Sequence, residues 1–142
     1  MNWKEVKVHY TKQLEDGRLK RVTEPFLFDA QSFTEAEERA YSKFGEEIQG
    51  KFSIEAITKK AYEDIFYYED ADDWYQCKVA YISIDGDEGK EKKVSKNFLV
   101  TAETTKQAIE RMQESLSDMV GGFEIPEVKK TALQEVIPYE AD

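Results

Sequence analysis

The sequence is poor in the residues that form disulfides, hold metals or act as nucleophiles. It contains one cysteine, Cys77, and one histidine, His9, among its 142 residues. A lone cysteine excludes a disulfide within the chain, and a reducing compartment is the default for such a protein. No apolar run approaches the roughly 18 residues that a membrane-spanning helix needs, and no apolar stretch follows the first charges as it does in a signal peptide. We therefore expect a cytoplasmic protein with no membrane partner.

Motifs of catalysis and cofactor binding are also missing. There is no Gly-x-Gly-x-x-Gly fingerprint, no Walker loop and no Cys/His spacing of a zinc site. The run Asp-Gly-Asp-Glu-Gly at 85–89 suggests a calcium loop, but Lys90 stands where such a loop needs glycine and Lys96 where it needs glutamate. We expect no enzyme activity, no metal and no cofactor.

Positive charge is in deficit as well. Thirty acidic residues face twenty basic ones, which gives a formal net charge of −10. Binding to a nucleic-acid backbone needs a basic footprint, so we expect no direct nucleic-acid partner. Hydrophobic residues make up 40% of the chain, which is enough for a packed core and argues against global disorder.

What the sequence does contain is an internal repeat. Residues 3–10 (WKEVKVHY) are echoed by residues 74–81 (WYQCKVAY), with tryptophan, lysine, valine and tyrosine in register. Further positions match along both copies: Phe26/Phe98, Ala36/Ala108, Arg39/Arg111, Gly50/Gly122, Phe52/Phe123 and Tyr68/Tyr139. We predict a first repeat at 1–69, an acidic linker at 70–73 and a second repeat at 74–142, with the two repeats packed as one globular unit.

Each repeat is predicted to fold as a β-β-α-β unit. Val6, Val8 and Tyr10 alternate with polar residues, which indicates a half-buried strand. A turn leads to a second strand, expected at 19–28 and again at 91–100. Pro25 has no backbone N–H to donate to a neighbouring strand, so it favours an edge or a bulge at that point of the strand.

A helix follows the second strand in both copies. Ser32 precedes Glu35 by three residues and Thr104 precedes Gln107 by three, so both copies have a capping-box pattern. Apolar residues then follow a helical stripe: Phe33, Ala36, Ala40, Tyr41, Phe44 and Ile48, and in the second copy Ala108, Ile109, Met112, Leu116 and Val120. Gly50 and the pair Gly121-Gly122 are expected to cap the helix ends.

A third strand begins at Phe52 or Phe123, and the segments 61–66 and 132–137 close the units as strands or as single helical turns. The predicted fold is α+β, a tandem duplication with antiparallel sheet, one amphipathic helix per repeat and pseudo-two-fold symmetry. Its six main strands form either one continuous sheet or two small ones.

Four motifs resemble those of a known family. They are the opening Trp-x-x-x-Lys-Val, the run 23–26 (TEPF), the run 33–37 (FTEAE) and the junction 72–75 (DDWY). They resemble a group of uncharacterised bacterial and phage proteins, catalogued as domain of unknown function 4494, over nearly the whole chain. These residues are landmarks of a scaffold, so the resemblance implies a cytoplasmic bacterial or phage protein and brings no substrate and no catalytic residue.

The strongest candidate for a binding surface is a tryptophan–lysine pair that occurs in both repeats. Trp3 precedes Lys7 by four residues, and Trp74 precedes Lys78 by four. Each pair therefore lies on one side of its strand, opposite the valines. Tryptophan is enriched at interaction hot spots, which favours a binding role for all four residues. The alternative is that each tryptophan is a core residue, as large aromatics in small proteins usually are.

Other candidates have simpler interpretations. His9 lies on the polar side of its strand and is matched by Ala80, which indicates a solvent-facing histidine. Cys77 replaces Val6 and indicates a small buried hydrophobe. The carboxylates Glu63 and Asp64 leave open an unrecognised hydrolase.

Two functional hypotheses from different classes remain. The first is a non-catalytic acidic interaction protein that binds a protein partner, including one that itself handles nucleic acid. The alternative is a small-molecule or nucleotide-binding protein with its pocket at the junction of the two repeats. The oligomeric state stays open.

Overall fold

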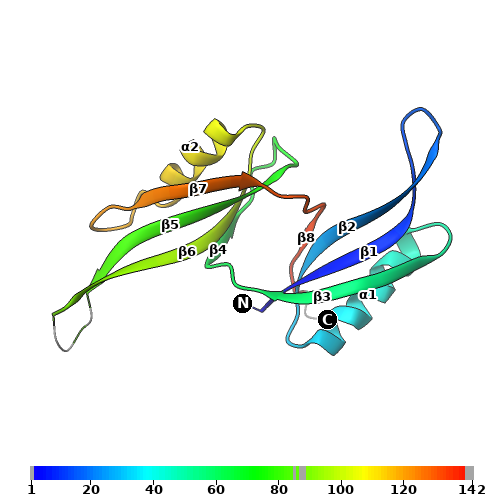
Figure 1. Cartoon of the computed structure of the whole chain (residues 1–142), viewed down its shortest axis with the longest axis horizontal. Coiled ribbons are helices and arrows are strands. Elements are labelled where there is room, and N and C mark those ends of the chain that lie inside the picture. The colour runs from blue at the N-terminus through cyan, green and yellow to red at the C-terminus, as the bar shows by residue number, and fades with distance from the viewer. Residues whose placement is uncertain (1, 85, 87–88, 140–142) are drawn as a thin grey trace. The chain divides into compact units, whose positions relative to one another are not determined.

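The computed structural model describes residues 2–84, 86 and 89–139. Within them the elements follow in this order: β1 (Trp3–Gln13), β2 (Leu19–Asp29), α1 (Phe33–Glu47), β3 (Phe52–Lys60), β4 (Asp64–Phe66), β5 (Trp74–Ile84), β6 (Glu91–Thr101), α2 (Thr105–Ser115), β7 (Glu124–Lys130) and β8 (Val136–Ile137) (Figure 1). This confirms the predicted α+β class with two β-β-α-β arrangements. The closing segments contain short strands, β4 and β8, and not helical turns.

The strands of the described residues form two four-stranded sheets, so the main strands are divided and do not make one sheet. The strand orders are β3-β1-β2-β8 and β4-β6-β5-β7. The long pairs β1/β2 and β5/β6 are antiparallel, whereas β8 and β4 each join their sheet as a short parallel strand. Matched residues of the two repeats have matching partners: Val6 is opposite Phe26, and Cys77 is opposite Phe98.

The compact units do not have the bounds of the sequence repeats. Unit 1 comprises the chain up to Ala61 together with the segment from Ala132 onward, and unit 2 comprises Tyr62–Thr131. The difference arises because the closing segments are exchanged between the repeats. We call residues 62–68 and 132–139 the exchanged segments. The first contains β4 and pairs with β6, and the second contains β8 and pairs with β2.

Both helix starts form as the local sequence predicts. The Ser32 side chain accepts a hydrogen bond from the Glu35 amide at 3.1 Å, and Thr104 accepts one from the Gln107 amide at 3.0 Å. The Gln107 side chain in turn accepts a hydrogen bond from the amide of Glu103 at 2.7 Å. These bonds satisfy amide donors that a helix cannot satisfy internally.

The helix ends differ from the prediction. Helix α1 ends at Glu47 and α2 ends at Ser115, so Gly50 and Gly121-Gly122 lie beyond the caps. These glycines have positive φ angles of 97°, 92° and 77° and serve turns before β3 and β7. Val120 was placed on the buried stripe, but it is 96% exposed because α2 stops before reaching it.

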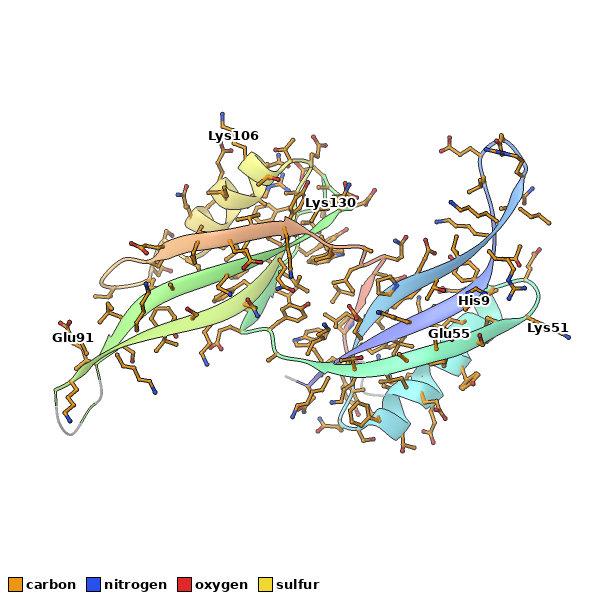
Figure 2. All side chains as sticks on the ribbon, viewed as in Figure 1. His9, Lys51, Glu55, Glu91, Lys106 and Lys130 are labelled. Carbon is orange, nitrogen blue, oxygen red and sulfur yellow. The ribbon has the colours of Figure 1, made fainter. Side chains whose placement is uncertain are left out.

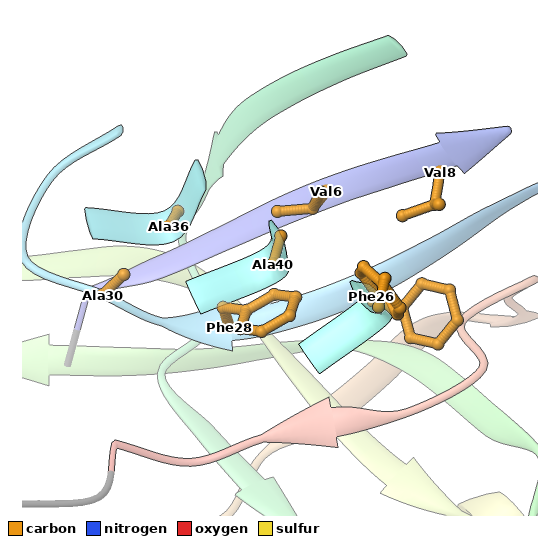
Figure 3. Close-up of a cluster of buried hydrophobic side chains, with 8 residues drawn as sticks. Val6, Val8, Phe26, Phe28, Ala30, Ala36 and Ala40 are labelled. Atoms are coloured by element: carbon orange, nitrogen blue, oxygen red, sulfur yellow. The ribbon is translucent and has the colours of Figure 1, made fainter. Parts of the chain in front are cut away.

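One helix packs against each sheet and closes one core. In unit 1 the core contains the valines of β1, the phenylalanines of β2 and the alanines of α1 (Figure 3). In unit 2 the equivalent positions are filled by residues that include Cys77, Val79, Phe98 and Met112. Within the described residues, no helix is long and apolar enough to cross a membrane.

Pro25 lies on β2, which is an inner strand of its sheet between β1 and β8, so the expectation of an edge strand or a bulge is not met. The β1/β2 register passes Pro25 without a bulge, with Lys7 opposite it. The Pro25 carbonyl accepts the Gln134 amide at 3.0 Å. The N and O atoms of a strand residue point to the same side, so the missing N–H faces the exchanged segment at a point where β8 has not yet begun.

Candidate functional site

The four predicted binding residues lie on the sheet faces that carry no helix. Val6 and Val8 contact α1, and Trp3 and Lys7 alternate with them, so these two share the opposite face. The same holds for Trp74 and Lys78 in unit 2. Both members of each pair lie within one strand, β1 or β5.

The two tryptophans are buried and do not form an exposed aromatic surface. Trp3 is 4% exposed and Trp74 is 5% exposed, and the Trp74 ring lies 6.0 Å from the ring of Tyr67. Of the two interpretations that the sequence leaves open, this burial favours core residues, because strand alternation defines a face and not what covers that face. Lys7 is exposed, and Lys78 is partly exposed and lies 3.5 Å from Glu127 of β7. A binding role for these four residues stays a prediction, and only the lysines offer it an accessible group.

His9 is engaged by its neighbours on β2. Its Nε2 accepts a hydrogen bond from Arg21 Nε at 3.2 Å, so Nδ1 carries the proton and donates to Thr23 Oγ1 at 2.9 Å. Figure 2 labels His9 on β1, in the sheet of unit 1. With both ring nitrogens held in this way, His9 links β1 and β2.

Cys77 is fully buried between β6 and β7 in the core of unit 2. Burial disfavours the charged thiolate and raises the pKa of the thiol from 9.0 to about 11. The thiol is therefore neutral and inert at neutral pH, as the sequence predicts for a residue in the place of a valine.

The carboxylates Glu63 and Asp64 contact different neighbours. Asp64 accepts a hydrogen bond from the Ile65 amide at 2.8 Å, and Glu63 lies 4.0 Å from the Lys96 ammonium. Within the described part of the chain, no three side chains of the metal-ligating types converge. The 85–89 run lies partly outside the described residues.

Unit 2 holds its exchanged segment with an arginine that sequence reasoning did not single out. Arg111, on α2, is only 8% exposed. It donates two hydrogen bonds of 2.7 Å to the Asp70 carboxylate and one of 2.8 Å to the Thr101 carbonyl. Its guanidinium also lies 4.5 Å from the ring centroid of Tyr68. A guanidinium that is hydrogen-bonded to a carboxylate and lies over an aromatic ring is a specific anchor.

Unit 1 repeats this arrangement with the matching arginine of α1. Arg39 donates to the Asp29 carbonyl and, at 2.8 Å, to the carbonyl of Pro138 in the other exchanged segment. Its guanidinium lies 5.8 Å from the ring centroid of Tyr139. The matches Arg39/Arg111 and Tyr68/Tyr139 are visible in the sequence. What the sequence does not show is that each arginine binds the tyrosine of the other repeat.

A groove in unit 1 lies between α1 and the exchanged segment. It has a volume of about 670 Å³, and its lining includes Arg39, Lys43, Glu135 and Tyr139. Lys43 forms ion pairs with Glu47 at 2.8 Å and with Glu135 at 3.2 Å. Burial acts to lower the pKa of Lys43, but these two carboxylates outweigh it and the pKa is raised.

Exposed carboxylates form a second surface feature of α1. Glu37, Glu38 and Glu46 are exposed, and none of the three takes part in an ion pair within the described residues. We call them the acidic helix surface. No lysine or arginine of the described residues therefore lies within ion-pair distance of these carboxylates.

The fold and its arginine-held segments define an α+β protein made of two similar four-stranded units. The chain belongs to the family described as domain of unknown function DUF4494, whose model matches residues 2–139. This confirms the family that the sequence motifs resemble. No curated protein and no solved structure matches the chain.

Proposed function

We propose that this chain is a non-catalytic interaction protein that binds a protein partner through the acidic helix surface. The observation that carries this proposal is the set of exposed, unpaired carboxylates on α1, in a chain with a net charge of −10. A basic protein surface complements them, and such complementarity chiefly raises the association rate and the specificity. The partner can be one that itself binds nucleic acid, because such proteins have the required basic surface.

A charge-reversal experiment tests this proposal. Glu37→Lys, Glu38→Lys and Glu46→Lys, combined in one variant, replace the acidic helix surface with positive charge. We expect the partner captured by the wild-type chain to be lost, and the association rate with the purified partner to fall by about tenfold or more at low ionic strength. Capture followed by mass spectrometry identifies the partner, and stopped-flow fluorescence measures the rate.

A matched control separates position from total charge. The control variant reverses three exposed carboxylates in unit 2, at Glu110, Glu114 and Asp118, and so changes the net charge by the same amount. We expect it to retain most of the association rate. Equal losses in both variants would show that total charge acts, and unchanged binding in both would exclude the acidic helix surface as the interface.

The groove of unit 1 favours small-molecule or nucleotide binding as a second candidate. It lies where α1 of the first repeat meets the exchanged segment of the second, so residues of both repeats line it. Two cations and two aromatic rings line it together with four carboxylates: Arg39, Lys43, Phe28, Tyr139, Glu35, Glu46, Glu47 and Glu135. A bound ligand should stabilise the protein by about 2.7 kcal/mol at a hundredfold excess over its dissociation constant. A thermal-shift panel of nucleotides and metabolites checks this. A shift that persists in Lys43→Ala would place the ligand elsewhere, and no shift with any compound would count against this candidate.

The location and the source of the protein belong to the same proposal. A cytoplasmic location is supported by the single buried cysteine. A bacterial or phage source is implied by the family resemblance.

A further inference from the structure

The two exchanged segments are held by the same contacts at matching positions. In unit 2, β4 places Ile65 opposite Leu99 and Phe66 opposite Val100. In unit 1, β8 places Val136 opposite Leu27 and Ile137 opposite Phe28. These four pairs are the same positions of the repeat. Each unit therefore pairs the edge of its second strand with the closing segment of a repeat.

The backbone contacts before these strands match as well. The Gln134 amide donates to the Pro25 carbonyl at 3.0 Å, and the Glu63 amide donates to the Asn97 carbonyl at 2.8 Å. In both cases the segment extends a sheet edge, a mode of recognition that depends mainly on main-chain hydrogen bonds. Neither strand edge is paired with the closing segment of its own repeat.

The contacts that hold the segment in unit 1 do not depend on which copy of the chain supplies it. They are main-chain hydrogen bonds, the hydrogen bond from Arg39 to Pro138, the ion pair between Lys43 and Glu135, and the packing of Leu133 and Ile137. A second copy presents the same atoms. Exchange of an identical element between copies costs little because every contact that breaks is made again.

We propose that the segment 132–139 is exchanged between two copies of this chain, so that each copy completes unit 1 of the other. The partner at this surface is a second copy of the chain. The balance between one copy and two is set by the effective concentration of the chain's own segment relative to the segment of a neighbour. Arg39 and Lys43 determine how fast the segment leaves the edge of β2, because their contacts with Pro138 and Glu135 must break before exchange.

Isotope mixing of the full-length protein tests the proposal. Unlabelled and ¹⁵N-labelled copies are mixed at high concentration and followed by native mass spectrometry, with and without a pulse of mild denaturant. We expect mixed-isotope dimers to form slowly, and to form faster after the pulse. After dilution they should persist for much longer than the time needed to mix the samples. Absence of mixed dimers at every concentration and after the pulse would overturn the proposal.

The variant Arg39→Ala distinguishes segment exchange from an ordinary surface dimer. Its lost hydrogen bond is absent from the monomer and from the exchanged dimer alike. We therefore expect the exchange rate to rise by about tenfold or more, while the equilibrium ratio of dimer to monomer stays within about twofold of wild type. A dimer that dissociates at once on dilution, or whose equilibrium ratio shifts with Arg39→Ala, would contradict exchange.

Two further variants keep the test decisive. Lys43→Ala removes the ion pair with Glu135 and is the milder change if Arg39→Ala fails to fold; we expect a rate increase of a few-fold, in line with a partly exposed ion pair. Arg18→Ala is the control, because Arg18 contacts Asp16 in the hairpin loop and should leave the rate unchanged. An equal rate increase in Arg18→Ala would show that general destabilisation, and not release of the segment, controls the exchange.

Discussion

Cutting the chain within the segment 69–73 should leave its two halves bound to each other. A protease site inserted between the exposed residues Asp72 and Asp73 produces one half that ends with the first exchanged segment and another that ends with the second. Each half then contributes a strand to the unit formed mainly by the other half. Dissociation requires both strands and both arginine anchors to release together, so we expect co-elution in size-exclusion chromatography at micromolar concentration.

The controls for this experiment use the anchors themselves. The cut double variant Arg39→Ala/Arg111→Ala should separate at concentrations where the cut wild type stays associated. Arg111 contributes most, because its guanidinium is nearly buried and makes two bonds to Asp70. Strong denaturant should separate the halves in every case. If the cut wild type elutes as two independent halves, the closing segments do not join the repeats as described.

Phe44→Ala should cost about 3–5 kcal/mol of the free energy of unfolding. The Phe44 ring is 1% exposed and makes edge-type contacts with three other rings, with centroid distances of 4.7 Å to Phe26, 6.2 Å to Phe28 and 6.2 Å to Phe52. Its removal deletes the central member of this cluster and leaves a cavity. Urea titration followed by circular dichroism measures the loss.

A position on the exposed side of the same helix provides the reference. Glu38→Ala should change the free energy of unfolding by no more than about 0.5 kcal/mol. A cost for Phe44→Ala below about 1 kcal/mol, with an unchanged denaturant slope, would mean that α1 does not close the core of unit 1 in solution.

Features that depend on neighbouring residues were the ones that could be predicted from the sequence. Ser32 and Thr104 cap their helices because each side chain reaches an amide three residues away. Val6 and Val8 face the core because strand alternation is a local property. The repeat itself could be read from matched positions, and it correctly predicted that the two helices carry matching arginines.

Features that depend on distant partners could not be predicted in this way. Strand alternation placed Trp3 on the face opposite the valines, but burial of that residue depends on what covers the face. The end of α2 at Ser115 depends on where the chain turns toward β7, and the apolar residue at Val120 gave a false indication. The exchange of closing segments leaves no trace in composition or spacing, because a segment looks the same whichever repeat it completes.

The exchange also determines the order in which the protein can be completed during synthesis. Unit 2 is one continuous stretch, Tyr62–Thr131. Unit 1 combines the stretch up to Ala61 with the segment from Ala132 onward, which is synthesised after unit 2. The pair Leu27–Val136 joins positions more than a hundred residues apart, and such contacts of high sequence separation form late because a large loop must close first. During synthesis, unit 2 can therefore be completely folded while the edge of β2 is still unpaired. Nascent unit 1 remains an unfinished sheet until the last strand emerges.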